Sequence, residues 1–391
     1  MKILITSDWY YPVVNGVVRS ILNLKSYLEC RGFDVRVLTL SNSTESYKKD
    51  KVYYIGSLSA GKIYPEARIS ATLRNKFIKE IKDWKPDIVH SQCEFSTFMM
   101  ATKIAKKASC PIIHTYHTIY EDYTHYFSPS KKVGKKVVSV FSKAISDRTD
   151  YIIAPSKKTL EILKSYDIED EKIQIIPTGI EMPERLDDKY KLRDYYGFDK
   201  NDKIILYLGR LAEEKNIEEL IDYYGKINMD KLKFILVGGG PYLGHLKKYS
   251  EKIDKRIYFA GMVRPEEVNN YYRMADAFVS ASKSETQGLT YYEAMSNGTL
   301  AICRKDLCLD HVIIDGFNGY QYKDFFDFEK FLQIIFLDDK KREELSKNAR
   351  SYALENFSID SFGKKCEKLY KKALERDVRW KFLFITKIIK L

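Results

Sequence analysis

The chain has 391 residues, of which 45% are hydrophobic and 31% are charged. This length suggests two or three domains, and this composition excludes a disordered, collagen-like or low-complexity protein. The six cysteines form no C-x-x-C pair, which argues against a zinc site or a redox motif and fits a reducing cytosol. No apolar run approaches the ~20 residues that cross a bilayer.

The net charge of +12 is distributed unevenly. Residues 1–175 carry 28 basic and 19 acidic side chains, and residues 364–391 carry 10 and 3. Residues 176–363 carry 28 and 32. Basic surfaces attract nucleic acid, anionic lipid or phosphorylated substrates, or simply keep a protein soluble. Charge alone leaves these alternatives open.

Strand-like and helix-like segments alternate twice along the chain, which favours an α/β protein with parallel sheets. Several strand candidates, such as residues 204–208, are continuous apolar runs, typical of strands buried on both faces. Twelve strands exceed one ordinary sheet, so we expect two doubly wound domains that divide near Pro177-Thr178-Gly179. The strands are expected at 2–7, 35–40, 51–55, 88–91, 111–116 and 151–154, then at 173–177, 203–208, 233–237, 257–260, 277–281 and 299–303.

Ligands of open α/β sheets bind beyond the carboxyl ends of the strands, so the loops at these ends are the candidate sites. In the loop 8–17 a helix should begin near Gly16, where backbone amides favour an anion. The loop lacks G-x-G-x-x-G, which argues against an ordinary dinucleotide site. The loop 115–126 is dense in His, Tyr and carboxylate side chains, including His117 and His125. These residues are either a binding or catalytic loop or structural histidines with surface aromatics.

Two loops in the second half of the chain, after the expected strands 203–208 and 277–281, also carry charged side chains. Arg210 and Lys215 flank the expected start of a helix, which suits a diphosphate, although both could also be surface charges. Glu285 and Glu293 are eight positions apart, with a Gly-Leu turn between them. Carboxylates accept several strong hydrogen bonds and are good partners for sugar hydroxyls. Two carboxylates at this spacing are by themselves a modest signal.

The pattern Glu285-x7-Glu293, with Gly288-Leu289 inside it, resembles the signature of retaining glycosyltransferases of family 4. That family has the GT-B fold, two Rossmann-like domains facing each other across a cleft. The resemblance implies domains at 1–175 and 176–359, with a C-terminal helix 360–391 packing back on the first. Further similar motifs are Asn15-Gly16-Val17, Ala154-Pro155-Ser156, 176–180, Gly209-Arg210 with Lys215, and 315–319.

The resemblance also implies roles for the loop residues, and it implies that no metal and no cofactor is required. The reaction would retain the anomeric configuration by front-face displacement, so Glu285 and Glu293 are not the acid and nucleophile of a hydrolase. Arg210 and Lys215 would hold the donor diphosphate, Glu285 the donor sugar and Glu293 the ribose, while Gly16, Gly288 and Leu289 would face the phosphates and His117 the sugar near the reacting carbon.

A narrower resemblance concerns the acceptor. Residues 116–126 and 284–290 are similar to bacterial diacylglycerol glucosyltransferases of the monoglucosyl-diacylglycerol synthase type. This implies a UDP-glucose or UDP-galactose donor and a diacylglycerol or glycosyl-diacylglycerol acceptor. The alternatives are a capsular, teichoic-acid or protein-linked glycan acceptor, or a non-catalytic nucleic-acid or lipid binder, which the intact site residues disfavour. The acceptor candidates are Tyr116, Glu121, Asp122, His125 and Tyr126.

Two segments combine lysines with apolar side chains, a mixture that suits a helix lying in the membrane interface. Residues 131–145 place Val133, Val137 and Phe141 at helical spacing, and residues 379–391 are an aromatic and basic tail. Either segment could instead be a helix packed on the core. We expect a peripheral protein on the cytoplasmic face of the membrane and no bound nucleic acid. The membrane candidates are Lys131, Lys132, Lys135, Lys136, Phe141, Trp380, Phe382 and Phe384.

Overall fold

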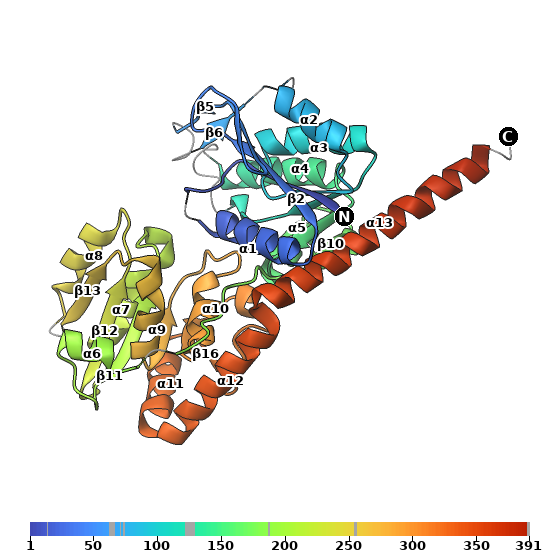
Figure 1. Ribbon diagram of the computed structural model, residues 1–391. Helices are drawn as coiled ribbons and strands as arrows, with labels where there is room; N and C mark the ends of the chain where they lie inside the picture. The colour runs from blue at the N-terminus through green and yellow to red at the C-terminus, as the bar shows by residue number, and fades with distance from the viewer. Residues whose placement is uncertain are drawn as a thin grey trace. The chain divides into compact units, whose positions relative to one another are not determined.

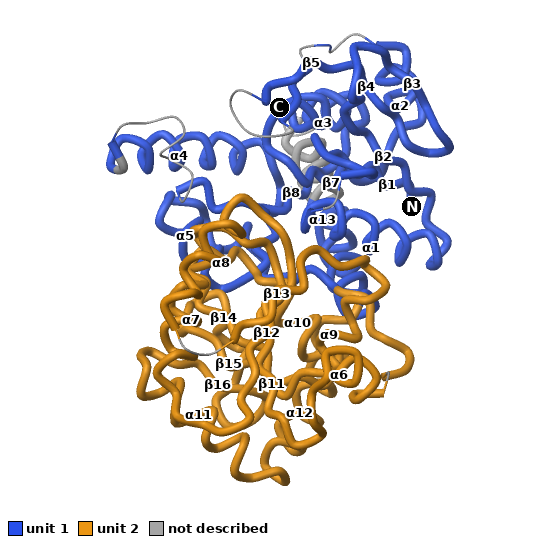
Figure 2. The backbone as a smooth tube through the Cα atoms, turned by 90° about the vertical axis from the view of Figure 1, so that its left-hand side faces the viewer, with its two compact units in different colours: residues 1–179, 359–391 blue, residues 180–358 orange. Residues whose placement is uncertain are grey.

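The chain forms two compact units in a computed structural model that describes residues 1–13, 15–61, 67–70, 72, 75–121, 130–186, 188–253 and 256–388. The side chains of 131 and 377–388 lie outside this description. Unit 1 comprises residues 1–179 and 359–391, and unit 2 comprises residues 180–358 (Figure 2). The sequence led us to expect the two boundaries at 175/176 and 359/360.

Unit 1 is built on an eight-stranded sheet of order β10-β9-β8-β7-β1-β2-β4-β3, in which only β3 runs antiparallel to its neighbour. Its strands are β1 (Lys2–Ser7), β2 (Asp34–Leu40), β3 (Tyr47–Lys49), β4 (Val52–Ile55), β7 (Ile88–Ser91), β8 (Ile112–Thr115), β9 (Tyr151–Ala154) and β10 (Ile173–Ile175), with a separate pair β5 (Leu58–Ser59) and β6 (Arg68–Ile69). Its helices are α1 (Gly16–Cys30), α2 (Lys76–Trp84), α3 (Ser96–Ala108), α4 (Lys131–Ser146), α5 (Lys157–Lys164) and α13 (Ile359–Ile388), with a 3-10 turn η2 (Asp170–Lys172).

Both faces of this sheet are covered because alternate residues of each strand point to opposite sides. Ile3 and Ile5 pack in one core with α1 and α13, whereas Leu4 packs in the opposite core with α2 and α3. Figure 1 shows these two helix layers on either side of the strands. This arrangement explains why the strands read as nearly continuous apolar runs.

Unit 2 contains a six-stranded, all-parallel sheet of order β13-β12-β11-β14-β15-β16. Ile204 and Leu206 face one core and Ile205 faces the other. The strands are β11 (Lys203–Leu208), β12 (Leu232–Val237), β13 (Ile257–Gly261), β14 (Ala277–Ser280), β15 (Leu300–Arg304) and β16 (Gly319–Tyr322). The helices are α6 (Lys191–Tyr196), α7 (Ile217–Lys226), α8 (Leu243–Ser250), α9 (Val268–Met274), α10 (Leu289–Ser296), α11 (Phe325–Leu337) and α12 (Asp339–Phe357), with 3-10 turns η3 (Glu213–Lys215), η4 (Pro265–Glu267) and η5 (Leu307–Leu309).

A buried ion pair joins the elements at the amino end of the unit 2 sheet. Arg193 donates to Asp276 at 3.0 Å and to the carbonyl of Met274 at 2.8 Å. Asp276 also accepts from the backbone of Ile204 at 2.8 Å and from Lys189 at 2.5 Å. Burial opposes the charge of Asp276, but the two cations outweigh it and hold the pKa of this carboxyl below its ordinary value. Removing any one charged partner would therefore leave a buried charge without compensation and destabilise unit 2.

The structure differs from the predicted strands at one unit boundary and at the sheet edges. We expected residues 173–177 to begin the second sheet, but β10 pairs with β9 at the edge of the first sheet. The prediction was wrong because the chain adds β10 to the edge of the first sheet before it reaches Pro177. The edge strand β3 was not predicted, since its three residues are all exposed. The edge strand β16 was not predicted either.

Candidate functional site

The loop between β14 and α10 carries the two carboxylates that the sequence singled out. Glu285 lies on the loop, and Glu293 lies in the second turn of α10. Gly288 caps the helix with φ of +75°, and a Cβ at this position would approach the ring of Tyr291 to 2.5 Å. Only glycine fits this turn without strain. The turn thus directs the first amides of α10, beginning at Leu289, beyond the end of the sheet.

Glu285 is joined to one of the two predicted diphosphate ligands. The ammonium of Lys215 donates to Glu285 Oε1 at 2.5 Å, and the two side chains are 19% and 18% exposed. Lys215 ends the 3-10 turn that follows β11, so the pair connects two loops 70 residues apart in sequence. Arg210 is mostly exposed and lies 3.6 Å from Glu214. Unit 2 therefore places a cation and a carboxylate together and leaves a second cation open to solvent.

Glu293 is held by a buried tyrosine. Its Oε2 accepts from the hydroxyl of Tyr272 at 3.1 Å, on the neighbouring helix α9. Burial first, and then the charge of Glu293, raise the pKa of the Tyr272 hydroxyl well above its ordinary value, so it remains a proton donor. This donor fixes the position of the Glu293 carboxylate.

In unit 1 the loops after β1 and β8 carry Gly16 and His117. Gly16 is the first residue of α1, and the side chain of Asn15 caps the helix by accepting from Val18 N at 2.9 Å. The helix start that the sequence predicted is confirmed at this position. His117 Nε2 lies 2.7 Å from Gln92 Oε1, and burial, with a contribution from His114, lowers the pKa of His117 to about 3. His117 is therefore a neutral imidazole.

The acceptor candidates fall into three situations. Tyr116 is buried and its hydroxyl bonds to Ser142 at 3.0 Å, so its burial does not support a contact with an acceptor. Glu121 accepts from the hydroxyl of Tyr166 at 2.6 Å and lies 3.3 Å from Lys135. The remaining predicted residues, Asp122, His125 and Tyr126, lie outside the described residues.

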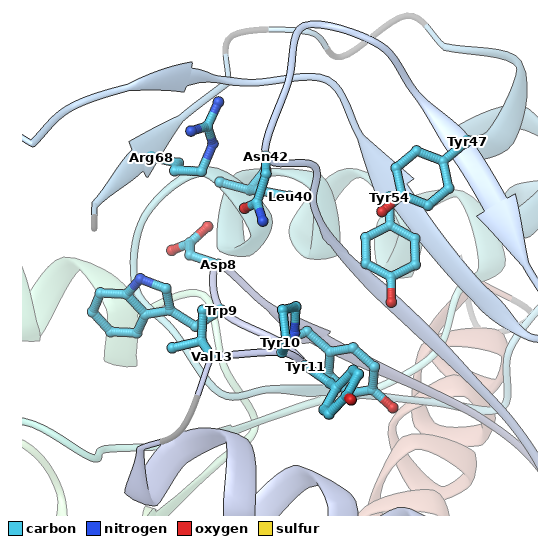
Figure 3. A pocket seen from close by; sticks show the side chains of 11 residues that line it. Asp8, Trp9, Tyr10, Tyr11, Val13, Leu40, Asn42, Tyr47, Tyr54 and Arg68 are labelled. Carbon is cyan, nitrogen blue, oxygen red and sulfur yellow. The ribbon is translucent and has the colours of Figure 1, made fainter.

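A pocket of about 250 Å³ opens at the ends of β1, β2 and β4, where the sequence predicted no specific ligand (Figure 3). Aromatic side chains, among them Tyr10 and Tyr54, surround the polar groups of Asp8, Asn42 and Arg68. One oxygen of Asp8 accepts from Thr97 N at 2.9 Å, and burial raises its pKa to about 6. Aromatic walls with a few polar groups are typical of sites for small polar ligands. The only sequence signal for this pocket was the loop 8–17.

Helix α4 leaves an apolar stripe exposed among its lysines. Val133, Val137 and Val140 are 59%, 52% and 63% exposed. Phe141 is not part of this stripe, because its ring stacks on Phe95 at a centroid distance of 5.7 Å. The predicted Lys132, Lys135 and Lys136 are all exposed. The side chains of Lys131, Trp380, Phe382 and Phe384 lie outside the described residues, although the last three belong to the backbone of α13.

The part of the chain that the structure describes contains no helix long and apolar enough to cross a bilayer. No group of three His, Cys, Asp or Glu side chains in these residues is arranged to hold a metal ion.

Comparison with known proteins assigns both units. Residues 14–182 match Glycosyltransferase Family 4, and residues 188–352 match Glycosyl transferases group 1. The chain is 33% identical over 387 residues to an alpha-monoglucosyldiacylglycerol synthase of Streptococcus pneumoniae, covering 96% of this chain and 86% of that one. It is 30% identical over 394 residues to an alpha-monoglucosyldiacylglycerol synthase of Acholeplasma laidlawii, covering 96% and 98%.

The fold has solved counterparts. The crystal structure of Anabaena HepE in complex with UDP-glucose matches with a TM-score of 0.73 at 16% identity, covering 95% of this chain and 100% of that one. Two parallel-sheet α/β units of this kind define a glycosyltransferase with the GT-B fold, as the sequence predicted. The chain belongs to glycosyltransferase family 4.

Proposed function

We propose that the protein is a retaining hexosyltransferase that moves glucose or galactose from a UDP-sugar to diacylglycerol or a glycosyl-diacylglycerol, forming an α-glycosidic bond. The observation that carries this proposal is the identity of 33% and 30%, along 96% of the chain, to two alpha-monoglucosyldiacylglycerol synthases. A capsular, teichoic-acid or protein-linked glycan remains the alternative acceptor.

The side chains of unit 2 suit the donor. Lys215 and Arg210 are cations beside the start of α7, where a diphosphate would meet charge-assisted hydrogen bonds. Glu285 would exchange part of its bond to Lys215 for a hydroxyl of the donor sugar, and Glu293 would accept from the ribose. These contacts require no metal, because the cations and helix amides neutralise the leaving diphosphate.

The chemical step follows from the same groups. The acceptor oxygen forms a bond to the anomeric carbon on the face from which the bond to the diphosphate oxygen breaks, so the configuration is retained. The leaving diphosphate oxygen takes the proton of the acceptor hydroxyl. Lys215 and Arg210 stabilise the charge that develops on the diphosphate. No separate proteinaceous base is needed in this scheme.

Helix α4 supports a membrane-bound acceptor. Its exposed valines lie among Lys132, Lys135 and Lys136, the combination that binds an anionic interface. Each lysine near such a surface contributes ~1 kcal/mol. We therefore extend the proposal to peripheral binding on the cytoplasmic face, with the tail 379–391 as a second contact.

A transfer assay tests the proposal directly. Radiolabelled UDP-glucose and UDP-galactose are offered with diacylglycerol, or with glucosyl-diacylglycerol, in anionic mixed micelles. A labelled lipid product supports the proposal and identifies the sugar and the acceptor. Slow UDP-sugar hydrolysis without a lipid product refutes the lipid acceptor and favours the glycan alternative. Truncation after Glu375 should weaken vesicle flotation more than UDP binding; unchanged flotation would make the tail a structural element.

A further inference from the structure

A chain of hydrogen-bonded side chains runs through unit 1 from His117 to the C-terminal helix. His117 Nε2 lies 2.7 Å from Gln92 Oε1, and Gln92 Nε2 lies 3.1 Å from His90 Nε2. His90 Nδ1 lies 2.7 Å from the hydroxyl of Tyr370 on α13. Three hydrogen bonds thus join residues that are 253 positions apart in sequence.

The topology of the sheet explains why these residues meet. β7 and β8 are parallel neighbours, with His90 opposite Ile113, so the segments that follow them, which contain Gln92 and His117, lie side by side. Helix α13 packs on one face of the sheet, and the ring of Tyr370 meets the ring of His90 edge to face at 5.7 Å. Gln92, His90 and Tyr370 are each at most 1% exposed.

The direction of the bonds follows from the amide of Gln92. An amide oxygen only accepts, so His117 donates to it from Nε2. An amide nitrogen only donates, so His90 accepts at Nε2, where the hydroxyl of Thr115 at 2.7 Å is a second donor. His90 must therefore carry its own proton on Nδ1, which it donates to Tyr370. The three bonds therefore point the same way, and the two histidines are opposite tautomers.

This arrangement decides which nitrogen of His117 is left for a ligand. Its Nε2–H is occupied by Gln92, and its Nδ1 has no hydrogen-bond partner among the described residues. Nδ1 in this tautomer carries a lone pair and can only accept. Burial keeps both rings neutral, lowering the pKa of His90 and of His117 to about 3.

We propose that Gln92, His90 and Tyr370 are positioning residues that hold His117 as the Nε2–H tautomer, so that Nδ1 accepts a hydrogen bond from a hydroxyl of the donor sugar. The part of this inference that concerns the sugar rests on the proposed function, whereas the tautomer does not. Removing the last acceptor, Tyr370, leaves the Nδ1–H of His90 buried without a partner. His90 then moves its proton to Nε2, where Thr115 Oγ1 is an acceptor at 2.7 Å. A protonated Nε2 cannot accept from the amide nitrogen of Gln92 at 3.1 Å, so the amide reverses and His117 becomes the Nδ1–H tautomer.

The tautomers are measured by ¹⁵N NMR of the histidine-labelled, full-length protein, with His90 and His117 assigned by single substitutions. In the unmodified chain we expect Nε2–H at His117 and Nδ1–H at His90, a result that needs no variant to fold. In Tyr370→Phe we expect both tautomers to change. The matched control is Tyr27→Phe. This variant also removes a tyrosine hydroxyl bonded to α13, at Glu367 Oε2, but Tyr27 makes none of the three hydrogen bonds between His117 and Tyr370.

Activity provides the second measurement. Tyr370→Phe should lower kcat for sugar transfer about tenfold with KM for the UDP-sugar nearly unchanged, because one supporting hydrogen bond is lost. Tyr27→Phe should leave kcat unchanged. Equal tautomers at His90 and His117, or a His117 tautomer unaffected by Tyr370→Phe, overturns the inference. If the tautomers behave as expected but the unmodified protein turns over no UDP-sugar, the proposed function fails. The inference that Gln92, His90 and Tyr370 set the tautomer of His117 is then retained.

Discussion

Asp8 makes the free energy of unfolding depend on pH in the direction opposite to that of an ordinary carboxyl group. Burial, with a contribution from Glu94, raises its pKa from 3.8 to about 6. As the pH rises from about 4, the unfolded chain loses this proton first, so the folded state loses stability until the pH passes about 6. At ~1.4 kcal/mol per pKa unit, the cost above pH 7 is ~3 kcal/mol. Asp8→Asn removes this cost and keeps an oxygen that can accept from Thr97 N. We expect the variant to be more stable than the unmodified chain by up to ~3 kcal/mol at pH 7.5, with the difference vanishing near pH 4.

Urea unfolding followed by tryptophan fluorescence measures this effect. All three tryptophans of the sequence belong to unit 1, so their signal reports the unit that contains Asp8. The matched control is Asp83→Asn, the same chemical change at an exposed position of α2 in the same unit. It should leave stability unchanged at every pH. A destabilised Asp8→Asn at pH 7.5, or a gain that does not depend on pH, would refute the reasoning.

The remaining predictions concern the donor site, the unit 2 core and the membrane surface. Glu285→Gln should lower kcat by roughly 10–100-fold while UDP binding, measured by calorimetry, stays equal or tightens, because the variant releases the ammonium of Lys215. Lys215→Ala should instead weaken UDP binding, and equal UDP affinity would remove its assigned role. Asp276→Asn should destabilise unit 2 by ~3–5 kcal/mol at pH 7, with the loss shrinking as acid protonates this carboxyl in the unmodified chain, as followed by hydrogen exchange of unit 2 amides. Val137→Asp should reduce flotation with anionic vesicles, whereas Phe326→Asp, at a still more exposed apolar position on α11 of unit 2 (77% against 52%), should not.

The sequence predicts the interior of each sheet well and its edges poorly. Strands such as β11 and β12 are continuous apolar runs because helices cover both of their faces, and this pattern is visible without a structure. Edge strands have only one neighbour and fewer buried positions. β3 has none, so its sequence carries little signal. The pairing of β10 with β9 depends on where the chain crosses between the units, which local periodicity does not report.

The candidate site shows a similar division. The sequence singles out the motif residues of unit 2 because they are close in sequence and lie at strand ends. The bond between Lys215 and Glu285 was not predicted, since it joins loops 70 residues apart whose proximity depends on the order of β11 and β14 in the sheet. The contact of His90 with Tyr370 is even harder to predict from the sequence, because it requires α13 to pack on unit 1 after the chain has passed through the whole of unit 2. The spacing of residues in the sequence predicts which of them are candidates for binding, but their hydrogen-bond partners from distant segments are known only from the fold.

Unit 1 places several buried polar atoms near the carboxyl ends of its central strands without a hydrogen-bond partner among the described residues. They include one oxygen of Asp8, the hydroxyls of Thr6 and Thr97, and Nδ1 of His114. Glu94 Oε1 and His114 Nε2 also make no hydrogen bond there, although they lie 3.4 Å from each other. An unsatisfied buried polar group costs ~1–3 kcal/mol, so a chain selected for stability alone would not be expected to gather several at one edge. Proteins break such rules chiefly where a ligand or ordered water completes the bonds. The Asp8→Asn experiment is therefore also a test of function. A variant that is more stable but transfers sugar more slowly would show that the cost of this carboxylate is retained for binding, whereas a variant that is more stable and fully active would assign the cluster to buried water alone.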